Sequence, residues 1–279
     1  MKTLDLIDKA LEKTYRKDVL TPFIKAINDY KLIEENDKIA VCISGGKDSL
    51  ILAKLFQRLK VHNKFNFELE FISMDPGYLA ENRRLLESNC ENLGIPIKIF
   101  NSDIFEVVEK VSGDYPCYLC ARMRRGFLYK AASDLGCNKI ALAHHMDDVI
   151  ETTLINMFYG SQFKTMIPKL DAKNFPNMTL IRPLFYIREK DIIRFQNFCE
   201  FESIDCGCVV ACHKYSSKRY EVKQLIKQLE KIDKKIPLSI FNSASNINLL
   251  AVLGYFNENK KTSFEDVYQN RKDSIEEKE

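Results

Sequence analysis

The chain has 279 residues, of which 46% are hydrophobic, and a net charge of only +3. This length favours one large domain, alone or with appendages, and the composition supplies ample apolar residues for a core. The small net charge does not by itself indicate a nucleic-acid-binding protein, and no apolar run is long enough to span a bilayer.

Residues 1–36 predict an N-terminal helical segment. Leu4, Ile7 and Leu11 recur at helical spacing, and a second apolar set follows from Phe23. Residues 1–17 are charged throughout and contain no apolar signal core. We therefore expect a cytoplasmic protein that makes no contact with a membrane.

Residues 37–215 are expected to form the main domain, because strand-like and helix-like segments alternate there. Strands are predicted at Ile39–Ile43, Glu70–Asp75, Pro96–Phe100, Lys139–Ala143 and Thr179–Ile181. Helices are predicted from residue 50 and at 79–93, 118–135 and 146–159. This alternation predicts an α/β fold whose parallel, twisted sheet is covered by helices on both faces. Ligands of such sheets lie beyond the carboxyl ends of the strands.

The junction between the first strand and its helix is a candidate phosphate site, with the sequence Ser44-Gly45-Gly46-Lys47-Asp48-Ser49. Unpaired N–H groups at the helix start, glycines that permit close approach, hydroxyl donors and a lysine all suit an anion. Asp48 can hold a magnesium ion. The alternative is an ordinary glycine turn with a capping side chain.

A second motif, Ala143-His144-His145-Met146-Asp147-Asp148, begins at a strand end and opens a helix. Two carboxylates there could simply be helix caps. At the mouth of a nucleotide site, one of them, taken as Asp148, is expected to bind magnesium with Asp48, and an Asp or a His could act as a base. Asp75 ends the second strand at the same edge, so it should converge on the same nucleotide.

The cysteines form a third group of candidate ligands. Disulfides are not expected in a reducing compartment, so the clustered pair Cys117-Tyr-Leu-Cys120 suggests a redox dithiol, half a zinc site or part of an iron–sulfur site. Three further cysteines, Cys206, Cys208 and Cys212, could complete such a metal site. The other four are expected to be small core residues: Cys42, Cys90, Cys137 and Cys199.

Residues 216–279 are expected to form a C-terminal helical region with a charged tail. A helix from residue 216 has apolar residues on one face and lysines on the other. Residues 238–256 are interpreted as a further helical piece, and the charged stretch from Asn257 onward as frayed.

Together these motifs resemble the TtcA-type tRNA 2-thiocytidine synthetases, a branch of the PP-loop N-type ATP pyrophosphatases. The resemblance covers roughly residues 20–230. It is carried by Ser44–Ser49, Cys117–Gly126 (C-x-L-C-x-R-x-R-R-G), Ala143–Asp148, Asn156–Gly160, Ile181–Leu184 and Arg188–Asp191.

The resemblance implies the following cofactors and sites. ATP would bind at Ser44–Ser49, Asp75, Ala143 and His145, with Mg²⁺ on Asp48 and Asp148. A [4Fe-4S] cluster would bind Cys117, Cys120 and a third cysteine. The cysteine spacing near this third ligand departs from the family pattern. As the third ligand we favour Cys208, then Cys206, then Cys212. Asp48, Asp148 and Arg124 would be catalytic, with Arg124 orienting the base or a phosphate.

The implied reaction is ATP-dependent thiolation of a cytidine in the tRNA anticodon loop. ATP would adenylate the C2 oxygen of the base, releasing pyrophosphate, and sulfide carried by the cluster would displace AMP. A sulfur donor such as a cysteine desulfurase is the implied partner. Homodimers are common among relatives, although the sequence carries no interface signature.

Four other functions remain open. A 2-thiouridine-forming thiolase is disfavoured because the extra zinc-ribbon cysteine pairs of those enzymes do not occur here. A tRNA lysidine synthetase needs no cysteine triad, and a cluster-dependent desulfidase needs no PP-loop. A zinc-stabilised tRNA-binding protein with a vestigial ATP site is disfavoured because Lys47, Asp48 and Asp148 are intact.

Overall fold

A computed structural model of the chain describes residues 1–62, 66–102, 104, 116–204, 218–257 and 260–269, with backbone only for 116–121. Contacts divide the chain into two compact units, Met1–Lys227 and Gln228–Glu279. The domain boundaries expected from the sequence, at residues 36/37 and 215/216, stay predictions. No helix in the described part is both long and apolar enough to cross a membrane.

Six strands form the sheet of the first unit in the order β3-β2-β1-β4-β6-β5. They are β1 (Asp37–Cys42), β2 (Phe67–Asp75), β3 (Ile97–Asn101), β4 (Lys139–Ala141), β5 (Lys169–Asp171) and β6 (Thr179–Ile181). All neighbouring pairs are parallel except β5 with β6, so the short edge strand β5 is an antiparallel addition that the sequence did not predict. The predicted α/β fold and its five strands are confirmed.

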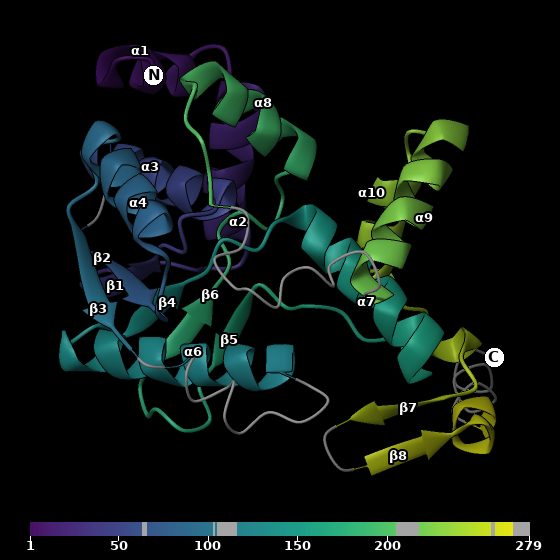
Figure 1. Cartoon of the computed structure of the whole chain (residues 1–279). Helices are drawn as coiled ribbons and strands as arrows, with labels where there is room; N and C mark the ends of the chain where they lie inside the picture. Colours follow the sequence, from purple (N-terminus) through teal and green to yellow (C-terminus); the bar gives the residue numbers. More distant parts are fainter. Residues whose placement is uncertain (63–65, 103, 105–115, 205–217, 258–259, 270–279) are drawn as a thin grey trace. The chain divides into compact units, whose positions relative to one another are not determined.

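Helices lie on both sides of this sheet (Figure 1). The helical segments of the described residues include α1 (Leu4–Glu12), the π-helical turn η1 (Arg16–Leu20), α2 (Thr21–Asp29), α3 (Lys47–Val61), α4 (Ala80–Asn92), α6 (Pro116–Asp134), α7 (Met146–Gly160), α8 (Glu189–Cys199), α9 (Lys218–Ile232), α10 (Ile236–Ser243) and the 3-10 turn η3 (Leu249–Ala251). The helices predicted at 79–93, 118–135 and 146–159 are confirmed to within two residues at each end.

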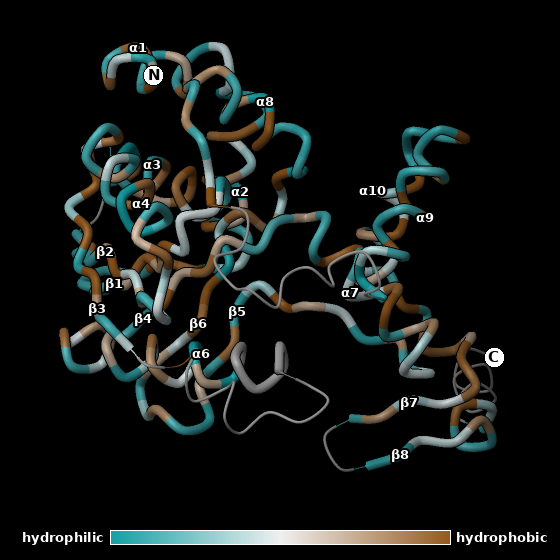
Figure 2. Tube along the Cα trace, in the orientation of Figure 1, coloured by the Kyte–Doolittle hydropathy of each residue, from teal (hydrophilic) through white to brown (hydrophobic). Residues whose placement is uncertain are grey.

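The core follows from the alternation of side chains along the strands. On one face, Ala40, Cys42 and Ile72 belong to a buried cluster that includes Tyr129 and Ala132 of α6. Residues of β1 that alternate with these, Ile39 and Val41, are also fully buried. A strand buried on both faces is typical of a parallel sheet covered by two helical layers. Figure 2 shows the hydrophobic residues concentrated on these strands.

The N-terminal helices pack against the same unit through aromatic contacts. Phe23 of α2 meets Phe56 of α3 with ring centroids 5.5 Å apart, and Tyr15 meets Phe195 of α8 at 5.0 Å. All three phenylalanines are fully buried. The predicted N-terminal helical segment is therefore confirmed, and it is part of the larger unit.

Two interpretations of the C-terminal region are wrong. The predicted helix over 238–256 ends at Ser243, and Gly254–Asn257 forms β7, which pairs with β8 (Lys260–Ser263). Residues 264–269 are helical rather than frayed, and their start is capped because the Ser263 N–H donates to Asp266 Oδ2 over 2.8 Å. The apolar run 249–253 has no period that distinguishes helix from strand, and its first three residues, Leu249–Ala251, form the 3-10 turn that precedes β7.

Candidate nucleotide site

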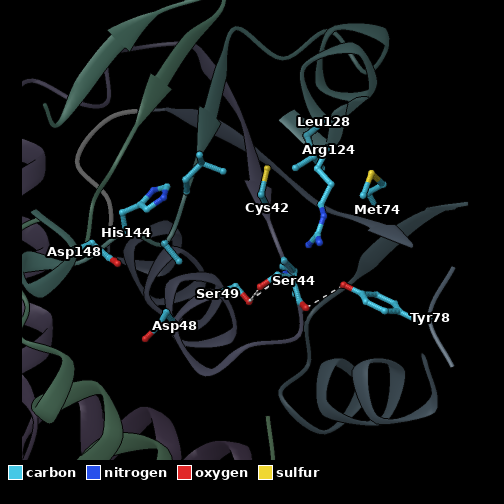
Figure 3. Close-up of a pocket in the computed structure, with 13 residues that line it drawn as sticks. Cys42, Ser44, Asp48, Ser49, Met74, Tyr78, Arg124, Leu128, His144 and Asp148 are labelled. Atoms are coloured by element: carbon cyan, nitrogen blue, oxygen red, sulfur yellow. Dashed lines mark hydrogen bonds between the residues drawn. The ribbon is translucent and has the colours of Figure 1, made fainter. Parts of the chain in front are cut away.

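The order of the strands creates a crevice next to β1. From β1 the chain moves to β2 and β3 on one side, whereas β4 and β6 lie on the other side. At such a reversal the loops that follow two neighbouring strands diverge, and ligands bind between them. Here these are the loop after β1 and the loop after β4. A cavity of about 340 Å³ opens at this position (Figure 3).

The cavity collects residues from four segments of the chain, 42–49, 74–78, 124–128 and 142–148. It is lined by Cys42, Ile43, Ser44, Asp48, Ser49, Met74, Tyr78, Arg124, Leu128, Leu142, Ala143, His144 and Asp148. Ser44, Asp48, Ser49, Arg124, Ala143 and Asp148 are among the site residues expected from the sequence. Met74, Tyr78 and the apolar lining were missed, because their place depends on how distant strands pack and not on a local motif.

The phosphate turn is built around the hydroxyl of Ser49. This hydroxyl donates to the carbonyl of Gly46 over 2.8 Å and accepts the N–H of Ser44 over 3.1 Å. Gly45 has φ +81°, a conformation that disfavours any residue with a Cβ. The turn therefore has a defined shape, and α3 begins within it at Lys47.

The loop after β2 supports this turn from the side. The hydroxyl of Tyr78 donates to the carbonyl of Ser44 over 3.3 Å. Asp75 does not line the cavity: its carboxylate accepts the N–H groups of Gly77 and Tyr78 and contacts Arg83. Although burial opposes its charge, these bonds lower the pKa of Asp75. Asp75 thus shapes the loop, and its expected contact with ATP stays a prediction.

Asp48 carries a buried oxygen that suits a cation. Its Oδ1 has no hydrogen-bond partner among the described residues, and it lies 3.8 Å from Nε2 of His145. Burial raises the pKa of Asp48 despite His145 and Lys47 nearby. A buried carboxylate oxygen without a donor is costly, so this site fits Mg²⁺. Within the described part, no group of three potential metal-binding side chains has converged.

Asp148 and His144 line the cavity from the start of α7 and from the loop that precedes it. Asp148 accepts the backbone N–H of His145 over 3.0 Å at the start of α7. Burial opposes its charge, but His145 and that hydrogen bond lower the pKa of Asp148. Burial also lowers the pKa of His144 to about 4, so its ring is neutral at pH 7, and its Nδ1 has no described hydrogen-bond partner. His145, expected at the nucleotide, is buried and is not among the residues that line the cavity.

Lys47 is held at the turn by two carboxylates. Its Nζ lies 3.3 Å from Oδ2 of Asp48 and 3.2 Å from Oε1 of Glu189, the first residue of α8. The other oxygen of Glu189 lies 2.6 Å from Nζ of Lys223. Burial opposes the charge of Glu189, but the hydrogen bond from Lys223 and the two lysine charges lower its pKa to about 2.

The cluster ligands fall largely outside the described residues. Cys206, Cys208 and Cys212 lie there entirely, and Cys117 and Cys120 are placed only as backbone in the first turn of α6. The four cysteines expected in the core are confirmed as buried free thiols. Burial raises the thiol pKa of each of them, which makes them poor metal ligands.

The chain belongs to the PP-loop domain family, whose model matches residues 16–205. The family resemblance inferred from the motifs is thereby confirmed. Among curated proteins, the chain is 43% identical over 187 residues to a tRNA-cytidine(32) 2-sulfurtransferase of Neisseria meningitidis serogroup A, covering 65% of this chain and 57% of the relative. It is 37% identical over 228 residues to the protein of that name from Burkholderia multivorans, covering 80% and 67%.

A solved structure shares the fold. The U34-tRNA thiolase NcsA from Methanococcus maripaludis, with its [4Fe-4S] cluster, matches with a TM-score of 0.66 and 24% identity, covering 89% of this chain and 86% of that one. This likeness confirms the PP-loop ATPase architecture. The chain spans 57% of the length of the Neisseria relative, so its complete activity is a matter of proposal.

Proposed function

We propose that the protein is an ATP-dependent tRNA thiolase that replaces the C2 oxygen of an anticodon-loop cytidine with sulfur. The two tRNA-cytidine(32) 2-sulfurtransferases at 43% and 37% identity support this reaction and this substrate. The proposal carries with it tRNA as the partner, a sulfur donor such as a cysteine desulfurase, and a cytoplasmic location.

The proposal rests on one observation: α6 contains both the cysteine pair and a residue that lines the cavity. Cys117 and Cys120 lie in its first turn, and Arg124, four residues after Cys120, lines the cavity. A helix rises 1.5 Å per residue, so Cys120 lies only about 6 Å along the axis from Arg124. Figure 3 shows Arg124 extending from α6 toward Ser44. One helix thus joins the cysteine pair to the nucleotide site, as a thiolase requires.

The residues of the cavity and Lys47, which neighbours the lining residue Asp48, suit the adenylation step. Ser44, Lys47 and the N-terminus of α3 would bind the phosphates and hold the charge that develops as pyrophosphate leaves. Asp48 and Asp148 would hold Mg²⁺. Arg124 would orient the base or a phosphate from the opposite side. His144 is neutral at pH 7, so one of its ring nitrogens is available to accept a hydrogen bond.

The cysteine set suits an iron–sulfur cluster by its chemistry, because soft thiolates are the ligands that iron–sulfur clusters prefer. Cys117, Cys120 and Cys208 would hold it, with Cys206 as the alternative third ligand. A bound cluster with three protein ligands would supply sulfur as the nucleophile. The target base must leave its stack to reach the cavity, and unpaired loop nucleotides suit this requirement.

The test is anaerobic purification followed by iron and sulfide analysis, absorption spectroscopy and thiolation of tRNA. We expect about four irons and four sulfides per chain and ATP-dependent 2-thiocytidine formation. Cys117→Ala should lose both the cluster absorbance and thiolation but still bind ATP. Cys199→Ala, which removes a buried thiol, is the matched control and should keep its iron.

Three outcomes would contradict the proposal. Thiolation retained by Cys117→Ala would remove the cluster from the reaction. A colourless protein with stoichiometric zinc and no ATP turnover would indicate a structural cysteine site in a tRNA-binding protein. Sulfur found in uridine rather than cytidine would change the substrate.

A further inference from the structure

Helix α9 contacts the nucleotide site from outside the residues that the PP-loop domain model matches. The match ends at residue 205, and α9 begins at Lys218. Nη1 of Arg219 lies 3.0 Å from Oδ1 of Asp148, which lines the cavity, and 3.2 Å from Oε2 of Glu151. Lys223 lies four residues later, on the same face of the helix.

Lys223 shares the carboxylate of Glu189 with the lysine of the phosphate turn. Glu189 is only 18% exposed and bridges Lys223 Nζ at 2.6 Å and Lys47 Nζ at 3.2 Å. A lysine ammonium has three donors, so Lys47 can bind a phosphate as well. This requires that the charge of Glu189 be balanced elsewhere, because an unbalanced carboxylate would compete with phosphate for Lys47.

The attachment of α9 does not depend on these two cations alone. Val222 and Ile226 of α9 are buried, at 2% and 5% exposure. The hydroxyl of Tyr159 at the end of α7 also donates to Glu221 over 2.8 Å. The apolar contacts supply non-directional stabilisation, so removing one charge should leave the helix in place.

We propose that Lys223 and Arg219 are positioning residues of the nucleotide site. Lys223 balances Glu189 and so leaves Lys47 free to bind the phosphates. Arg219 holds the carboxylate of Asp148 at the cavity wall. The inference rests on the proposed function only in assuming that this cavity binds ATP.

The test is calorimetric titration of the full chain with a non-hydrolysable ATP analogue plus Mg²⁺, and separately with AMP. Lys223→Met should weaken binding of the ATP analogue about tenfold, the size of a lost charged hydrogen bond, and leave AMP binding unchanged. AMP lacks the β- and γ-phosphates, so a loss confined to ATP reports on Lys47. Arg219→Met should weaken the Mg²⁺-dependent part of ATP binding.

The matched control is Lys227→Met. Lys227 lies one turn further along the same face and is exposed, so its loss should change neither affinity. Lys223→Arg retains the cation and should bind the ATP analogue within about twofold of the parent chain. Lys223→Gln is measured in parallel, and a thermal unfolding curve for every variant reports on folding.

If folded Lys223→Met lost affinity for AMP and for the ATP analogue equally, Lys223 would have a structural role and the inference would be overturned. Unchanged ATP binding in both Lys223→Met and Lys223→Gln would also overturn it. If the parent chain itself bound neither nucleotide, the proposed function would fail and this inference with it. Failure of the inference alone leaves parent binding intact, so the two failures are distinguishable.

Discussion

Asp147 and Asp148 are adjacent in the sequence, but their carboxylates contact different parts of the molecule. Asp147 accepts the backbone N–H of Glu189 over 2.6 Å and pairs with Arg188 at 3.0 Å, so it joins the starts of α7 and α8. Asp148 lines the cavity. At the scale of single residues, one carboxylate therefore supports the scaffold and its neighbour belongs to the candidate site.

This contrast predicts that the same substitution lowers stability at Asp147 and Mg²⁺-ATP affinity at Asp148. Asp147→Asn removes the charge that pairs with Arg188, so it should lower the free energy of unfolding by about 1–2 kcal/mol and leave Mg²⁺-ATP affinity unchanged. Asp148→Asn keeps an oxygen for the His145 N–H but loses the ligand charge, so it should weaken Mg²⁺-ATP binding. Urea unfolding and calorimetry measure the two quantities, and a reversed pattern would contradict the assignment.

Glu189 predicts a pH dependence of stability. Its pKa falls from 4.5 to about 2 in the folded protein, so the unfolded chain binds its proton first as the pH drops. The stabilisation is therefore complete above about pH 4.5 and is lost between pH 4.5 and 2. Glu189→Gln should lower the free energy of unfolding by about 2 kcal/mol at pH 7 and by less than about half as much at pH 3, as measured by urea unfolding. A cost that is equal at both pH values would argue against the ionised bridge.

At the scale of elements, the phosphate turn is fitted to a segment 159 residues later in the chain. The N–H of Ile204 donates to the carbonyl of Gly45 over 3.0 Å. A Cβ built on Gly45 would lie only 2.6 Å from Cδ1 of Ile204, which is itself buried. Glycine is required here both by the positive φ and by this close approach.

Gly136 provides a matched comparison for Gly45. It also has a positive φ, +74°, but a Cβ built there meets no atom within 4 Å. Gly136→Ala should therefore cost only the backbone strain, about 1 kcal/mol, with ATP binding unchanged. Gly45→Ala should lower stability further and weaken ATP binding, because the turn or Ile204 must shift. Thermal unfolding and ATP titration of both variants test this; equal effects would mean that the contact with Ile204 has no consequence.

At the scale of the whole molecule, every residue that lines the cavity belongs to the unit Met1–Lys227. The sheet and its hydrophobic core also lie in this unit. The remaining unit, from Gln228, contains the end of α9, α10 and the β7–β8 pair. A site whose residues all come from one unit should not need the other in order to bind its ligand.

We accordingly predict that a chain ending at Ile232, which keeps α9 whole, folds and binds ATP with the affinity of the full chain. Circular dichroism, thermal unfolding and calorimetry are the measurements. A truncated chain that folds cooperatively but has lost ATP binding would show that the C-terminal unit contributes to the site. The full-length chain under the same conditions is the control.

Motifs and periodicity determined most of the larger unit. The turn Ser44–Ser49, the wall residues Ala143 and Asp148, and the strands that precede them were readable because each is a local pattern of glycine, charge and apolar spacing. Where the signal is not local, prediction failed. β5 is three residues long, and the apolar run before β7 carries no distinguishing period.

The sequence alone determined the fold class, the position of the turn Ser44–Ser49 and the family, because strand and helix periods and the motif's spacing are properties of neighbouring residues. The tertiary structure decided which of these residues meet. The carboxylate of Asp75 accepts hydrogen bonds from its own loop, whereas Met74 and Tyr78 line the cavity. Helix α9 brings Arg219 to Asp148 and Lys223 to Glu189. The positions of Tyr78, Arg219 and Lys223 depend on the packing of segments 34 to 71 residues apart, for which a single sequence carries no local signal.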